Sequence, residues 1–67
     1  MSVARVTEIT ASSKTSFQDA IEKGIERAIK TLKNVEGAVI QDQKIILDEG
    51  KIVAYRVNMK VTFVLTD

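Results

Sequence analysis

The chain has 67 residues, with ten lysines and arginines against nine aspartates and glutamates, and no cysteine or histidine. These absences exclude disulfides, zinc sites built from cysteine and histidine, and nucleophiles that depend on either residue. The net charge of +1 does not favour nucleic-acid binding, and no apolar run is long enough for a membrane span. We therefore expect one domain over residues 1–67 in a cytoplasmic protein, with no nucleic-acid or membrane partner.

The first predicted element is a strand over Ala4–Thr10, which mixes β-branched residues with charges. A small polar loop over Ala11–Lys14 follows. Two residues could then cap a helix. Thr15 with Gln18 fits a capping box, and Ser16 directly before the first apolar residue is the other candidate.

The helix is predicted over Phe17–Lys33. Its apolar residues recur at spacings of three and four, which draws one buried stripe: Phe17, Ala20, Ile21, Gly24, Ile25, Ala28, Ile29 and Leu32. A glycine inside a helix costs about 1 kcal/mol relative to alanine. We therefore expect that Gly24 permits a close approach of the sheet or of a neighbouring helix.

A second strand is predicted over Ala38–Leu47, after Asn34 ends the helix and residues 35–37 lead out of it. Its two faces are both mixed in polarity. One would carry Val39, Gln41, Gln43, Ile45 and Leu47, and the other Ala38, Ile40, Asp42, Lys44 and Ile46. This mixture is expected of a strand that passes between subunits. Residues 48–50 (Asp-Glu-Gly) then form a hairpin turn.

The third strand, Val53–Leu65, is apolar at every second position and is predicted to be half-buried. Its thirteen residues reach about 43 Å, whereas the helix is about 26 Å long. One helix cannot cover such a strand, and disulfides are excluded. Self-association is therefore the expected means of stabilising so small a core.

The polar positions of this strand, Arg56, Asn58 and Lys60, form either a solvated or inter-subunit surface or a polar wall that meets a ligand. Tyr55, on the apolar side, is expected in the core with its hydroxyl at the rim. No spacing pairs a proton donor with an acceptor, so we expect no enzymatic activity. The predicted fold class is α+β, a β-α-β-β chain whose three-stranded antiparallel sheet is partly wrapped around one helix.

Two segments carry a family resemblance. The pieces TSFQDAIEKGIERAIKTLKNV and YRVNMKVTFVL, separated by a variable strand, resemble the dodecin family over essentially the whole length. The resemblance implies a hollow homododecamer with the sheets inside and the helices outside. It also implies a binding protein that stores or quenches flavins in pairs at a two-fold interface.

The resemblance also implies the positions of a cofactor-binding site: Gly37, Lys44, Tyr55 and Arg56. Flavin-binding members carry a stacking tryptophan where this chain has Gly37, and a glutamine that hydrogen-bonds the flavin ring where it has Arg56. Lys44 falls where members carry an arginine facing the interface. An arginine donates but does not accept hydrogen bonds, which favours an anion such as a phosphate.

This pattern leaves more than one class of function open. The first is a flavin, as riboflavin, FMN or FAD, or a flavin-nucleotide-like ligand at the subunit interfaces. The alternative is a structural or calcium-binding shell, because the chain resembles the tryptophan-less branch that includes calcium dodecins. The carboxylates of Asp42, Asp48 and Glu49 do not have the spacing of an EF-hand loop, although symmetry could gather carboxylates from several chains. A third class is an adaptor that recruits a protein through its edge strand.

Overall fold

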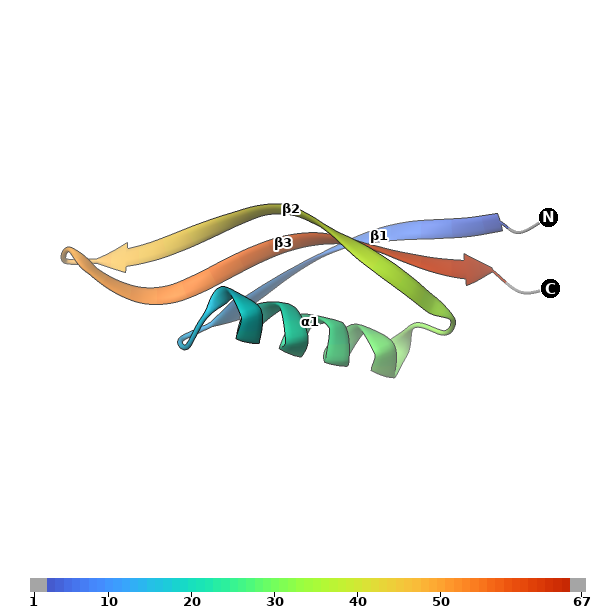
Figure 1. The fold of residues 1–67 in the computed structure, drawn as a ribbon, viewed down its shortest axis with the longest axis horizontal. Coiled ribbons are helices and arrows are strands. Elements are labelled where there is room, and N and C mark those ends of the chain that lie inside the picture. The colour runs from blue at the N-terminus through green and yellow to red at the C-terminus, as the bar shows by residue number, and fades with distance from the viewer. Residues whose placement is uncertain (1–2, 66–67) are drawn as a thin grey trace.

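The computed structural model describes residues 3–65, so residues 1–2 and 66–67 of the predicted domain lie outside the described part. Its elements are β1 (Val3–Ser13), α1 (Phe17–Thr31), β2 (Val35–Asp48) and β3 (Lys51–Leu65). The strands form one antiparallel sheet in the order β1-β3-β2 (Figure 1). The predicted fold class is confirmed.

The core lies where α1 packs against the middle of the sheet. Val57, Met59 and Val61 on β3 are fully buried, and Ala20 of the helix is fully buried with them. Burying a side chain of this size contributes about 1.5–3 kcal/mol. The predicted alternation of the third strand is therefore confirmed, and its buried side chains form most of the core.

The molecule is elongated, with extents of 51 × 19 × 13 Å and a radius of gyration of 13.8 Å. A compact chain of this length would have a radius near 11 Å. Its accessible surface is 5116 Å², against about 4,200 Å² expected for a monomer of this mass. Val53 and Leu65, at the two ends of the apolar face of β3, are 43% and 44% exposed. As predicted, one helix covers only the centre of the sheet.

The junction between β1 and α1 differs from the prediction. β1 continues to Ser13, so most of the expected loop over Ala11–Lys14 is strand, paired to β3 as far as Tyr55. Ser16 is the N-cap, and its side chain accepts a hydrogen bond from the Asp19 backbone N–H at 3.0 Å. The second of the two predicted caps is therefore the one used, because it leaves Phe17 at the first helical position.

The helix ends at Thr31 rather than at the predicted Lys33, and Leu32 already has extended backbone angles. Asn34 then adopts a left-handed φ of 59°, which asparagine tolerates better than most residues. Its carbonyl accepts a hydrogen bond from the Val64 N–H at 3.0 Å, and its amide donates to the Val64 carbonyl at 3.4 Å. These bonds tie the turn to β3, so the chain enters β2 at Val35 instead of Ala38.

The two predicted faces of β2 are wrong, because the strand contains irregularities in its pairing with β3. The pairing with β3 shifts between Ile40 and Asp42, which leaves Gln41 as an extra residue in a β-bulge. Strict alternation would separate Ile40 from Ile45. The bulge instead brings both to the helix side of the sheet, together with Ala38 and Gln43, opposite Met59, Tyr55, Val61 and Val57 of β3. A second shift, between Val35 and Gly37, leaves Glu36 unpaired.

The hairpin turn between β2 and β3 is confirmed at Glu49 and Gly50. Both have positive φ, 50° and 77°, as a two-residue type I′ turn requires. Asp48 and Lys51 pair on either side of it, so both strands are longer than predicted. A third shift close to the turn leaves Val53 without a partner, because Ile46 pairs with Ala54 and Leu47 with Ile52.

The predicted apolar stripe of the helix is buried only in part. Ala20, Gly24 and Ala28 are buried, and a Cβ placed on Gly24 would lie 2.9 Å from the Ala11 Cβ, which confirms the predicted close approach. Ile29, predicted as core, is 57% exposed. The helix contacts β1 and β3, and Ile29 lies on the flank that faces β2 across an open groove. No helix of the described residues is long and apolar enough to cross a membrane.

Candidate ligand site

The sheet face turned away from the helix carries a row of three polar residues across all three strands. Arg56 of β3 stands between Ser12 of β1 and Lys44 of β2, each its direct partner in the antiparallel pairing. Direct partners point to the same face. The Arg56 Nε donates a hydrogen bond to the Ser12 Oγ at 3.2 Å, which orients the guanidinium along the sheet.

Lys44 and Arg56 are both exposed and carry like charges directly opposite one another. Such a pair is destabilising in a sheet unless an anion lies between or above the two charges. Within residues 3–65 the salt bridge is between Lys23 and Asp19, on the helix. The strand pair therefore forms a basic spot on the sheet that attracts anions.

The next row along the sheet consists of Thr10, Asn58 and Asp42, and the Asp42 carboxylate is hydrogen-bonded within this row. The Thr10 hydroxyl donates to the Asn58 Oδ1 at 2.7 Å, and the Asn58 amide donates to the Asp42 Oδ1 at 2.6 Å. Asp42 pairs with Asn58, one row away from Lys44 and Arg56. The row stabilises the sheet across its three strands and fixes the Asp42 carboxylate on Asn58.

Tyr55 lies on the opposite face of β3 from Arg56, because successive residues of a strand alternate. Its ring packs edge-on against Phe17, with centroids 5.1 Å apart and planes at 76°. The ring is partly buried. Tyr55 was predicted in the core with its hydroxyl at the rim, and it lies beside the core, outside the fully buried cluster, where its ring contacts the first residue of the helix.

Gly37 lies far from the basic spot in the same chain. It pairs with Thr62, six residues along β3 from Arg56, which corresponds to about 20 Å. It is exposed, its φ is not in the left-handed region, and a Cβ there would meet nothing within 4 Å. The structure thus brings Lys44 and Arg56 together but separates them from Gly37, so one chain does not assemble the four predicted positions into one site.

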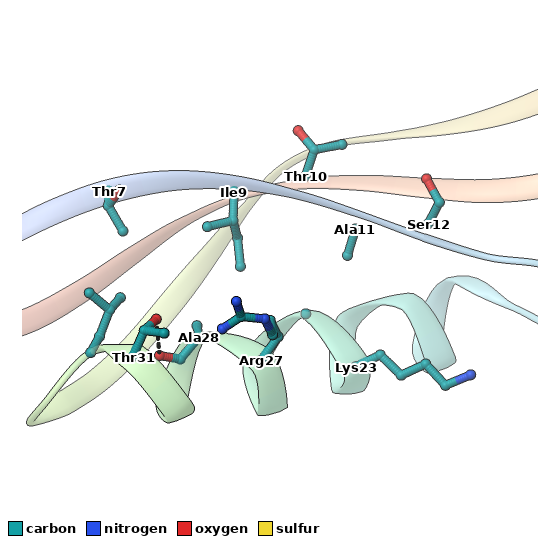
Figure 2. Close-up of a pocket in the computed structure, with 11 residues that line it drawn as sticks. Thr7, Ile9, Thr10, Ala11, Ser12, Lys23, Arg27, Ala28 and Thr31 are labelled. Carbon is teal, nitrogen blue, oxygen red and sulfur yellow. Dashed lines mark hydrogen bonds between the residues drawn. The ribbon is translucent and has the colours of Figure 1, made fainter.

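Two grooves flank the helix, and the sequence predicted neither. The β1 groove, between α1 and β1, has a volume of about 480 Å³. Figure 2 shows its apolar floor at Ile9 and Ala28, with Arg27 directed into the space between helix and strand. The β2 groove, between α1 and β2, has a similar volume of about 480 Å³, and Gly37 is among its lining residues. The exposed Ile29 stands in its wall.

A cluster of polar groups links the end of β1 to the start of the helix. The buried Ser13 hydroxyl donates to the Asp19 carboxylate at 2.5 Å and accepts from the Thr15 N–H at 2.9 Å. The hydrogen bond from Ser13, followed by that from Lys23, holds the pKa of Asp19 below its usual value. The cluster fixes the junction of β1 and α1 and is structural in this arrangement.

The acidic side chains of residues 3–65 do not gather into a metal site within one chain. Over residues 3–65 no group of three acidic side chains is placed so that it could hold an ion. Asp42 is engaged by Asn58, and Asp48 flanks the turn at the far end of the hairpin. A calcium ion takes six to eight oxygen ligands from carboxylates, carbonyls and water.

Comparison with known proteins matches this fold to one family. The family model described as Dodecin matches residues 3–66. A curated relative, the calcium dodecin of Mycobacterium tuberculosis, is 29% identical over 63 residues, which cover 94% of this chain and 89% of that protein.

Solved structures agree. The dodecin from Streptomyces davaonensis superposes with a TM-score of 0.93 at 35% identity, covering 98% of this chain and 97% of that one. The structure of the M. tuberculosis calcium dodecin, described as having a novel calcium-binding site, gives a TM-score of 0.84 at 25% identity, with coverages of 96% and 91%.

Proposed function

The chain belongs to the dodecin family, and we propose that it is a non-enzymatic protein that binds and stores a small molecule in a hollow homododecamer. The proposed ligand is a flavin or flavin nucleotide, held at interfaces between subunits. The proposed location is the cytoplasm, in keeping with the absence of cysteine. The elongated shape and the excess exposed surface support an assembly.

The observation that carries the choice of ligand is the pair of Lys44 and Arg56. Both are exposed, they stand directly opposite one another, and the adjacent carboxylate of Asp42 is taken by Asn58. A phosphate would offset the repulsion between the two cations. It would also accept hydrogen bonds from the N–H groups of the Arg56 guanidinium that are not bonded to Ser12. This favours a flavin nucleotide over riboflavin, which has no phosphate.

The test is a comparison of FMN with riboflavin by quenching of flavin fluorescence, after an absorption spectrum of the purified protein. FMN should bind more tightly, and Arg56→Gln should remove the difference. Lys60→Gln is the matched control, because Lys60 is an exposed cation on the same face of β3, two rows away. A protein that quenches neither flavin at any concentration tested would contradict the proposed ligand.

Gly37 supplies a second, independent probe. The chain lacks the ring on which a flavin would stack, and stacking contributes about 0.5–1.5 kcal/mol beyond burial. The open space around Gly37 and its ordinary φ permit a larger side chain. Gly37→Trp should therefore tighten riboflavin binding by about 2- to 12-fold. Equal affinity before and after the change would show that the flavin does not lie at Gly37.

The alternative function is a calcium-binding or purely structural shell. It is favoured by the similarity to the calcium dodecin of M. tuberculosis. In that case Ca²⁺ should raise the melting temperature of the assembled protein while riboflavin and FMN leave it unchanged. Magnesium at the same ionic strength is the control, because a non-specific charge effect would respond to both ions equally.

A further inference from the structure

The β2 groove is an apolar surface without a cover. Three isoleucines of the helix form one wall and three small or branched apolar residues of β2 form the other: Ile21, Ile25, Ile29, Val35, Ala38 and Ile40. Ile29 is 57% exposed and Ile40 is 39% exposed. An apolar groove of this kind, about 480 Å³ in volume, is expected to be filled by apolar side chains from elsewhere.

A second uncovered apolar surface lies at the other end of the molecule. Beyond Tyr55, β3 has no β1 partner and continues with β2 alone as a two-stranded hairpin arm, residues 45–54. In Figure 1 this arm extends past the start of the helix. It carries four exposed apolar side chains: Ile45 at 46%, Leu47 at 61%, Ile52 at 52% and Val53 at 43%.

The arm cannot fill the groove of its own chain. Val35, in the groove, pairs with Phe63, whereas Leu47, in the arm, pairs with Ile52. These β3 positions are eleven residues apart, which corresponds to about 36 Å. Only the arm of another copy can reach the groove.

The excess accessible surface of the chain is similar to the area that one partner buries in a stable interface. The chain exposes about 900 Å² more than a monomer of its mass should. A stable interface buries about 800 Å² on each partner. A two-stranded ribbon without a helix or third strand is also only marginally stable in water. Docking would therefore stabilise the arm and bury the apolar side chains of the groove.

We propose that the hairpin arm of one copy docks in the β2 groove of a second copy. This contact rests on the proposed assembly and deepens it. The groove and the arm are different surfaces of the chain, so the contact is heterologous and can repeat from copy to copy, and it gives a closed assembly where the rotation between copies closes.

The absence of cysteine makes a direct test possible. Two variants, Ile29→Cys and Leu47→Cys, are co-expressed, one of them with a tag that changes its mass, and the purified protein is treated with a short bis-maleimide. The proposal predicts a cross-linked species containing one tagged and one untagged chain. Lys30→Cys replaces Ile29→Cys in the control, because Lys30 is the next residue of the helix and is also exposed.

The mixed cross-link should form at least about tenfold more with Ile29→Cys than with Lys30→Cys, which is a difference of 1.4 kcal/mol in preference. Circular dichroism and the melting temperature of each variant check that it folds. Equal cross-linking from the two helix positions, or none from Ile29→Cys in a folded assembly, would overturn the docking. In that case flavin binding and a large mass would still support the proposed function, so the two failures are distinguishable.

Discussion

Gly24→Ala tests the closest contact between helix and sheet. A Cβ at this position would lie 2.6 Å from the Met59 Cε and 2.9 Å from the Ala11 Cβ. The methionine end can turn aside, although its side chain is fully buried. The Ala11 Cβ cannot, because it is fixed to the backbone of β1. The substitution therefore forces α1 and β1 apart.

Two opposing effects set the size of the change. Alanine in place of glycine favours the helix by about 1 kcal/mol, and overpacking a tight contact costs about 1–3 kcal/mol. We expect a net loss of about 1 kcal/mol in the free energy of unfolding. Urea denaturation at one fixed protein concentration measures it, because assembly makes stability depend on concentration.

The control removes the methyl group that causes the clash. Ala11→Gly in the Gly24→Ala background should restore the spacing, so the double variant should lose less stability than the two single variants together. A Gly24→Ala protein that gains about 1 kcal/mol would show that the Ala11 contact does not oppose a larger side chain, because only the helix preference would then be acting.

Other changes should follow the burial and charges described above. Val61→Asp should prevent folding, because it places an unpaired charge in the core, whereas Glu22→Gln on the exposed helix face should leave the melting temperature nearly unchanged. Asp19→Asn should destabilise the protein at neutral pH, chiefly through the weakened bond from Ser13. Because the folded pKa of Asp19 lies below its ordinary value of 3.8, this difference should be full above that pH and disappear as the pH falls through the folded pKa, as pH-dependent melts would show. Phosphate should raise the melting temperature of the parent protein, and Arg56→Gln should remove most of the gain, unless the cations are neutralised by carboxylates of another copy.

The hydrophobic periodicity of the sequence predicted which face of β3 and which face of the helix are buried. The alternation through Val57, Met59 and Val61 identified the buried face of β3, and the spacing of Ala20, Gly24 and Ala28 identified the helix face against it. Both follow from the period of the element alone. Ile29 fits the same helical period and is nevertheless exposed, because the helix packs on β1 and β3 and leaves an open groove between Ile29 and β2.

The register of β2 could not be predicted in the same way. Counting back from the two-residue turn places Lys44 opposite Tyr55, but the extra residue at Val53 moves it opposite Arg56. Bulges leave no clear signal in a strand of mixed polarity. The basic spot therefore exists because of an irregularity that the sequence does not announce, and the distance from Arg56 to Gly37 follows from the same register.

The mass of the assembled protein is the decisive measurement, because both the proposed ligand site and the docking of the arm require several copies. Native mass spectrometry or light scattering after gel filtration, at micromolar concentration and neutral pH, gives that mass. A homododecamer should appear as a single species of about twelve times the 7.4 kDa chain. A folded monomer that persists under these conditions would contradict it.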